Sequence, residues 1–434
     1  MASIQEALET IRGLGTVERM RAVADQTTVR PLSGANSHIH LPPNFSAFES
    51  VAQAVTLAAD QGVRVVGVTN YYDHRVYGEF AALARKRGVL PLFGLEIISL
   101  LDALVRAGTL INDPGNPGRM YLCGKGALGV AAPSARAAEL LGIIRRNDTA
   151  RMAEMTDKTA ACFRKVGFET GLDAGKVIDG IVARHGCPRN SVTIQERHIA
   201  MAFQQALFAL SPVERRAEAM AALYGKPAKS APDDAVAVQG EIRSNLLKAG
   251  KPAFVAETFL RFEQARELIL ALDAIPCYPT LADGANPICE YETPPEKLIG
   301  QLQQAEIRMA EFIPIRNTPD VLARYVRAMR TAGIAVVAGT EHNTLELLPV
   351  EPRCLRGAEV PPDLKAIFWE GACVVAAHQF LRLHGQCGFV DAQGRPHPGW
   401  PTAEKRIDAF ARMGQAVIQT YFDRHPASTG ASRT

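Results

Sequence analysis

The sequence lacks any closely spaced pair of cysteines. Its 434 residues include eight cysteines, and none of them forms a Cys-x-x-Cys motif. Disulfide frameworks and cysteine-rich zinc sites normally need such spacing. Scattered cysteines in a chain without a secretory signal indicate reduced thiols, most of them small buried side chains, so we expect a cytoplasmic protein.

Long segments of uniform character are also missing. No apolar segment approaches the roughly 20 residues that a membrane-spanning helix needs. Residues 1–6 lack the basic start and the apolar core of a signal peptide. The net charge is only +3, with no long basic or acidic stretch. We therefore expect neither a membrane nor a nucleic acid as a partner.

What the chain does contain is the composition of a globular protein, with 47% apolar and 21% charged residues. Short β-branched segments alternate with helical periodicity along much of the chain, and this alternation predicts a parallel α/β fold. The expected strands are residues 35–40, 63–69, 89–97, 119–123, 274–278, 311–315 and 333–339.

Helical periodicity without strands fills three further parts of the chain. Between about residues 133 and 272 the pattern is almost entirely helical, which predicts an insertion after the fourth strand. We expect a helical arm over residues 1–30, the α/β domain over 31–345, and a helical C-terminal extension over 346–434.

Two histidines end the first expected strand. His38 and His40 are two residues apart, and side chains at i and i+2 of a strand project to the same side. Two imidazoles can therefore reach one point in space, as two ligands of a divalent metal must.

Other potential ligands follow the remaining strands. Because the carboxyl ends of parallel strands meet at one rim, residues just past them are expected to converge. The candidates are Asp73, His74, Glu96, Tyr278, Glu341 and His342.

One more histidine lies in the helical insertion. The segment Thr193-Ile194-Gln195-Glu196 has the pattern of a capping box and predicts a helix start, with Arg197 and His198 in the first turns. Since a helix N-terminus favours anions, Arg197 there would suit a phosphate or carboxylate. A surface arginine beside a partly buried histidine is the alternative.

These motifs, in this order, resemble the PHP (polymerase and histidinol phosphatase) metal-dependent hydrolases, in particular the small-molecule phosphoesterase branch. The resemblance covers roughly residues 30–345 and implies a distorted (β/α)7 TIM-like barrel. The matching segments are Ser37-His38-Ile39-His40, Asp73-His74, Gly94-Leu95-Glu96, Glu196-Arg197-His198-Ile199-Ala200 and Gly339-Thr340-Glu341-His342.

The chain also departs from the family pattern. Cys277-Tyr278-Pro279 stands where the family has Ala-His-Pro, so Tyr278 replaces a ligand histidine. His342 follows Glu341 directly, whereas the family has Asp-x-His. Thr69-Asn70-Tyr71 could align with the family's Thr-Asp-His instead of Asp73-His74. One or two metals are therefore expected rather than three.

The resemblance implies hydrolysis by metal-activated water, most simply of a small phosphorylated metabolite. His38, His40 and Glu96 would hold a zinc, manganese or iron ion, completed by Glu341 or His342, with His74 as a further ligand. Glu96 could bridge to a second ion on His198. Glu341 or Asp73 could act as the general base. The candidates for gripping an anionic substrate are Arg197, Arg75 and Lys125.

Two other functions are open at this point. Metal barrels also catalyse C–N hydrolysis and sugar-acid isomerase or lyase reactions, in which Tyr278 could act as an acid–base group. Alternatively, a barrel that has lost ligands could serve as a binding scaffold. Assembly into a homo-oligomer is also possible.

Overall fold

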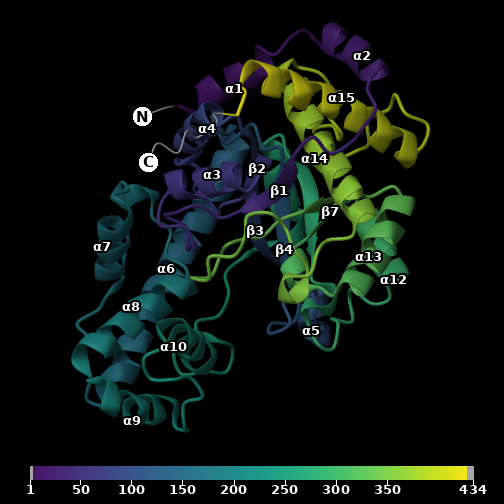
Figure 1. Cartoon of the computed structure of the whole chain (residues 1–434). Coiled ribbons are helices and arrows are strands. Elements are labelled where there is room, and N and C mark those ends of the chain that lie inside the picture. Colours follow the sequence, from purple (N-terminus) through teal and green to yellow (C-terminus); the bar gives the residue numbers. More distant parts are fainter. Residues whose placement is uncertain (1–2, 428–434) are drawn as a thin grey trace.

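The computed structural model describes residues 3–427, which form a nearly closed barrel with helices around it (Figure 1). Seven strands follow one another around the barrel in the order β1-β2-β3-β4-β6-β7-β8. The β1 and β8 ends meet where the His40 amide donates to the Glu341 carbonyl at 2.8 Å. The strands are β1 (Gly34–Ile39), β2 (Val63–Val68), β3 (Leu90–Leu100), β4 (Arg119–Lys125), β6 (Ile275–Thr280), β7 (Met309–Phe312) and β8 (Ala335–Ala338).

The strand β4 runs antiparallel to both of its neighbours, whereas the sequence pattern predicted a parallel fold. The connection after β3 contains only the short helix α5 (Asp102–Ala107) and turns back at the same end, where the Leu101 amide donates to the Gly118 carbonyl at 2.9 Å. The chain therefore re-enters the barrel from the rim. Consequently β4 descends from Arg119 at the mouth to Lys125 deep inside.

Two glycines let the neighbouring strands approach β1 closely. A Cβ atom on Gly339 would lie 2.3 Å from the Cβ of His38, and one on Gly67 would lie 2.6 Å from the Ser37 carbonyl oxygen. Neither clash could be relieved without moving the backbone of β1. Glycine at both positions therefore allows the neighbouring strands to pack directly against β1 and to hold His38 in place.

The helical insertion has a hydrophobic core of its own, formed by residues between Met152 and Val255. Figure 1 shows its helices grouped beside the barrel, away from the C-terminal helices. The first half of the long helix α6 packs on the barrel, and the second half belongs to the insertion core. The insertion helices are α6 (Ala135–Lys165), α7 (Ala174–His185), α8 (Glu196–Leu210), α9 (Val213–Tyr224) and α10 (Ala235–Ile242).

The C-terminal extension is part of the main core. Helix α14 (Pro362–Leu383) is buried along most of its length, because it packs on the barrel strands and is covered by α15 (Ala403–Arg424). His378 lies inside it as a core residue: its Nε2 is 2.9 Å from the Asp273 carbonyl, and its Nδ1 accepts from the Phe389 amide. The N-terminal helices α1 (Ile4–Arg12) and α2 (Val17–Asp25) join the same core.

The remaining helices surround the barrel, namely α3 (Val51–Asp60), α4 (Tyr77–Lys86), α11 (Phe262–Ala271), α12 (Pro295–Gln304) and α13 (Pro319–Thr331). Two expected boundaries differ from the structure. Strand β7 ends at Phe312, since Pro314 begins a 3₁₀ turn, and a short strand β5 (Leu260–Arg261) pairs with β3 where a helix was predicted. Within residues 3–427, no helix is long and apolar enough to cross a membrane.

Candidate metal centre

Three side chains predicted as metal ligands converge inside the barrel. The Nε2 atoms of His38 and His40 are 3.2 Å apart, and His40 Nε2 lies 3.3 Å from a carboxylate oxygen of Glu96. One potential ligand atom from each residue lies within 4.8 Å of those from the other two, and all three side chains are buried. Two imidazoles and one carboxylate form a donor set that suits a divalent transition metal.

The other side of His38 is held by a carboxylate that the sequence motifs did not identify. Glu311 in β7 lies 2.7 Å from His38 Nδ1, and Lys125 donates to the second Glu311 oxygen at 2.6 Å. Burial raises the pKa of Glu311, but Lys125 and His38 outweigh it and hold the pKa below its usual value. A proton on Nδ1 shared with this carboxylate leaves the His38 Nε2 lone pair free for a metal.

The polar atoms of this cluster fit a cation better than they fit one another. Burial lowers the pKa of His40, so its ring is neutral at neutral pH. A neutral His40 has at most one N–H at Nε2, which faces both the His38 nitrogen and the Glu96 carboxylate. The Glu96 oxygen nearest His40 has no hydrogen-bond partner within residues 3–427. This oxygen and the two Nε2 atoms beside it therefore lack enough donors, and a bound divalent ion would be a partner for their lone pairs.

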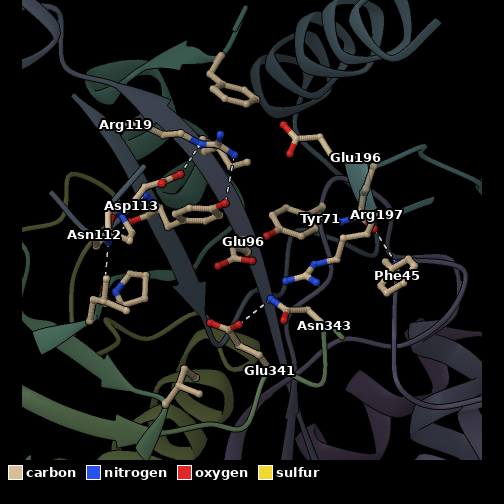
Figure 2. Close-up of a pocket in the computed structure, with 18 of the residues that line it drawn as sticks. Phe45, Tyr71, Glu96, Asn112, Asp113, Arg119, Glu196, Arg197, Glu341 and Asn343 are labelled. Carbon is tan, nitrogen blue, oxygen red and sulfur yellow. Dashed lines mark hydrogen bonds and ion pairs between the residues drawn. The ribbon is translucent and has the colours of Figure 1, made fainter. Parts of the chain in front are cut away.

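A cavity of about 500 Å³ lies between the barrel mouth and the insertion, with Glu96 on its wall (Figure 2). Five lining cations each contact a carboxylate; these are Arg119, Arg151, Arg243, Lys248 and Arg316. The sixth, Arg197, forms no ion pair within residues 3–427, and Figure 2 shows it pointing into the cavity. Burial and the nearby Arg243 lower the pKa of Arg197 to about 10, so it remains charged at neutral pH.

The insertion side of the cavity is organised around Glu196. Its carboxylate lies 2.8 Å from Lys248, 3.3 Å from Arg151 and 3.7 Å from Arg243. Burial raises the pKa of Glu196, but Lys248 and Arg119 outweigh it and bring the pKa to about 2. Glu196 is the first residue of α8, where the helix N-terminus also favours an anion. The helix thus begins two residues later than the capping box predicted, with Gln195 instead of Thr193 as its N-cap.

The structure places Tyr71, rather than Asp73 or His74, beside the histidine pair. The Tyr71 ring stacks on His40 with centroids 5.0 Å apart, and Tyr71 bridges to Glu96 through the backbone. Asp73 contacts Arg75 and Arg145, each at 3.4 Å, and does not line the cavity. The second possible alignment, through Thr69-Asn70-Tyr71, therefore matches the geometry of the rim.

His74 lies apart from the cluster. It packs against Tyr77, with ring centroids 5.2 Å apart, and neither of the metal-capable groups in the described chain includes it. Burial and the nearby Arg145 lower its pKa to about 3, which keeps the imidazole neutral. The backbone turns sharply before it, since Tyr72 has a φ of 48°.

Glu341 lines the cavity, but its carboxylate is already occupied. Arg316 contacts both oxygens, and Asn343 donates to one of them at 2.6 Å. Burial raises the pKa of Glu341, but Arg316 and His38 outweigh it, and the pKa is about 2. Such a carboxylate is a weak general base. Glu341 and His342 both have a φ of 55°, a conformation that costs roughly 1–3 kcal/mol per residue and clusters at functional sites.

Two predicted histidine ligands lie outside the side-chain groups of the described chain that could share an ion. Both ring nitrogens of His342 have partners, the Thr340 hydroxyl at 2.8 Å and the Leu348 carbonyl at 2.9 Å. His198 is the third residue of α8, and its Nδ1 accepts from the Gln195 amide at 3.1 Å. Its Nε2 has no partner in the described chain, and the ring edge meets Phe45.

Three predicted substrate contacts also lie outside the cavity. Lys125 is at the inner end of β4 and is buried against Glu311. Tyr278 projects away from the interior, because its neighbour Cys277 pairs with the inward-facing Cys123, and its hydroxyl bonds Glu292 at 2.8 Å. Arg75 is half-exposed beside Asp73.

Sequence reasoning missed Glu311 and Arg316, the two residues that hold His38 and Glu341. A glutamate inside the apolar segment Met309–Phe312 was the available signal, since a buried carboxylate in a strand needs a partner. Arg316 carried no signal, because the turn that presents it depends on Pro314 and on packing.

No protein-family model matches the chain, and no curated protein matches it in sequence. Among solved structures, the chain is similar to a candidate metal-dependent phosphoesterase from Bifidobacterium adolescentis, with 12% identity and a TM-score of 0.51, over 78% of this chain and 96% of that one. It also matches an amidohydrolase from Chromobacterium violaceum, solved with bound sulfate and no metal, with 17% identity and a TM-score of 0.48 over 77% and 97%. At 12% identity the likeness to the first of these structures concerns the fold alone, a distorted TIM-like barrel.

Proposed function

We propose that the protein is a metal-dependent hydrolase acting on a small anionic substrate. The observation that supports this is the convergence of the buried His38, His40 and Glu96 side chains, with Glu96 on the wall of the cavity and Glu311 fixing the His38 ring. Membership of the PHP family would account for the same motifs and for the barrel.

A divalent ion held by these three residues would polarise the scissile group and lower the pKa of a water molecule. Glu311 keeps the proton on His38 Nδ1 and so aims Nε2 at the ion, while Lys125 balances the Glu311 charge. Tyr71 covers His40 on one face and limits access of solvent to the ligands. Arg197 binds and orients the substrate from the insertion side.

A phosphoester is the substrate class that the charges of the cavity favour. Arg197 offers a guanidinium that no protein carboxylate neutralises in the described chain, and a guanidinium matches two phosphate oxygens. Together with a bound divalent ion, this makes the active end of the cavity positive. A neutral amide would leave the Arg197 charge without a partner.

Elemental analysis tests the proposal. We would express the wild type with manganese, iron and zinc supplied, and compare it with the His38→Ala and Glu96→Gln variants. The wild type should retain about one equivalent of metal or more, as expected for a preformed three-ligand site, and each variant should lose it. His397→Ala, at a partly exposed histidine outside the site, should retain the wild-type amount.

Activity then separates the remaining functions. Hydrolysis of a panel of phosphomonoesters and phosphodiesters, lost in Glu96→Gln, would support the phosphoesterase assignment. Bound metal with hydrolysis of amides but not phosphoesters would favour a C–N hydrolase. A protein that binds no metal would contradict the hydrolase proposal and leave the binding scaffold.

A further inference from the structure

The Glu341 carboxylate is closed off by a guanidinium. Arg316 donates from both terminal nitrogens, one to each oxygen, and the Nη1–Oε1 distance is 2.9 Å. Asn343 adds an N–H to Oε2 at 2.6 Å. This two-pronged geometry is the strong form of a charge-assisted hydrogen bond, and it leaves Glu341 little capacity to bind another cation.

The same carboxylate lies at the metal centre. The Glu341 backbone bridges to Ile39, between the two histidines, and Figure 2 shows the carboxylates of Glu341 and Glu96 pointing into one cavity. Among the other predicted ligands, Glu341 alone lines the same cavity as Glu96, since His74 and His342 face other partners and His198 does not line it. A second metal ion shared with Glu96 would therefore need Glu341. The position of a second ion therefore coincides with the position of Arg316.

The charges around the histidine pair support a single ion. Of the three carboxylates there, Glu311 is balanced by Lys125 and Glu341 by Arg316. Glu96 alone contacts no lysine or arginine in the described chain, and the nearest basic group to its carboxylate is the neutral His40 ring at 3.3 Å. Because buried carboxylates need compensation, Glu96 is where a metal ion is required.

We propose that the centre binds one divalent ion, at His38, His40 and Glu96, and that the Arg316 guanidinium permanently takes the place of a second ion on Glu341. This inference rests on the proposed metal-dependent function. It makes Arg316 a positioning residue that supplies the second positive charge of the centre, without the exchange or loss to which a bound ion is subject.

Titration with Mn²⁺ alone, followed by electron paramagnetic resonance, tests the inference on the full chain. The wild type should saturate at one equivalent and give the spectrum of an isolated ion. Arg316→Gln removes the guanidinium and frees Glu341 beside Glu96, so it should bind a second equivalent and show the spectrum of a coupled pair. Arg316→Lys, which keeps the charge, should remain at one.

Two further variants guard against a folding defect. Arg330→Met removes another partly buried arginine that bonds two carboxylates, Glu370 and Asp408, far from the cavity lining, and should stay at one equivalent. Glu341→Gln should also stay at one, because in this proposal Glu341 binds no metal. The wild-type and Glu341→Gln results hold even if Arg316→Gln does not fold.

The outcomes separate this inference from the function on which it rests. Two equivalents in the wild type, reduced to one by Glu341→Gln, would overturn the inference and leave the hydrolase proposal standing. One equivalent in a folded Arg316→Gln would overturn it in the same way. No Mn²⁺ binding by the wild type would overturn both.

Discussion

The barrel interior and the insertion handle charge differently. Beneath the histidine pair, Lys125 and Glu311 form one ion pair in a nearly solvent-free site, with exposures of 2% and 0%. At the insertion end, the single carboxylate of Glu196 serves three cations from different segments, and Lys248 is 34% exposed.

The difference follows from what holds each end. Strand register and close glycine contacts fix the barrel end. Removal of one member of an ion pair there leaves the other charge buried, because no neighbouring group can move to neutralise it. The insertion end is built from helices on a separate core, and solvent reaches some of its charges. We therefore expect large, local effects in the barrel and smaller, pH-dependent effects in the insertion.

The largest effect is expected from breaking the barrel pair. Glu311→Gln keeps the side-chain shape but leaves the Lys125 ammonium buried without an anion, which should cost about 3–5 kcal/mol of unfolding free energy. Chemical denaturation measures this loss. The double variant Glu311→Gln, Lys125→Met should recover part of it, because the stranded charge is removed; a double variant no more stable than the single one would contradict the ion-pair explanation.

The second effect is a pH dependence at the insertion end. The folded-state pKa of Glu196, about 2, lies below the ordinary value of 4.5. Its ionisation therefore stabilises the fold above pH 4.5, and this contribution is lost as pH falls toward 2. From the size of the shift, Glu196→Gln should cost about 3 kcal/mol at pH 6 and about 1 kcal/mol at pH 3.

Denaturation of wild type and Glu196→Gln at both pH values measures this difference. Glu267→Gln offers a control, since that carboxylate pairs with Arg136 at an exposed position. Its cost should be small at either pH. A cost for Glu196→Gln that is the same at pH 6 and pH 3 would show that its charge is not what stabilises the insertion end.

The third effect concerns the close approach of strands in the barrel. The Cβ atom of Gly339→Ala would lie 2.3 Å from the His38 Cβ, so β1 and β8 must separate. We expect a loss of about 2 kcal/mol in unfolding free energy, as overpacking usually causes, together with weaker metal binding. Thermal unfolding with and without Mn²⁺ checks both; an undiminished Mn²⁺-induced rise in Tm would argue against this role of Gly339.

The smallest effect has the opposite sign. Gly180 is exposed within α7 of the insertion, and a Cβ there would have no atom within 4 Å. Gly180→Ala should therefore raise the unfolding free energy by roughly 0.5–1 kcal/mol through helix propensity. A destabilised variant would mean that the insertion helices pack more tightly at this position than their exposure indicates.

Much of the fold could be predicted from the sequence because the signals are local. The β-branched segment at 63–69 and the apolar segment at 89–97 correspond to β2 and β3, and the helical pattern of 133–272 corresponds to the insertion helices and α11. The reversed direction of β4 could not be predicted in this way, because it depends on how the connection 101–118 folds back on the rim.

The candidate site likewise combines features that follow from local sequence with features that depend on long-range contacts. By itself the sequence indicated that His38 and His40 project to the same side, since side chains two residues apart in extended backbone do so, and His40 directly follows the last residue of β1. Only the tertiary structure decided which distant residues meet them. Tyr71 reached the rim instead of His74, Glu311 came to His38 across the barrel, and Arg316 took the carboxylate of Glu341. These contacts depend on strand order, register and turn geometry, which no spacing along the chain encodes.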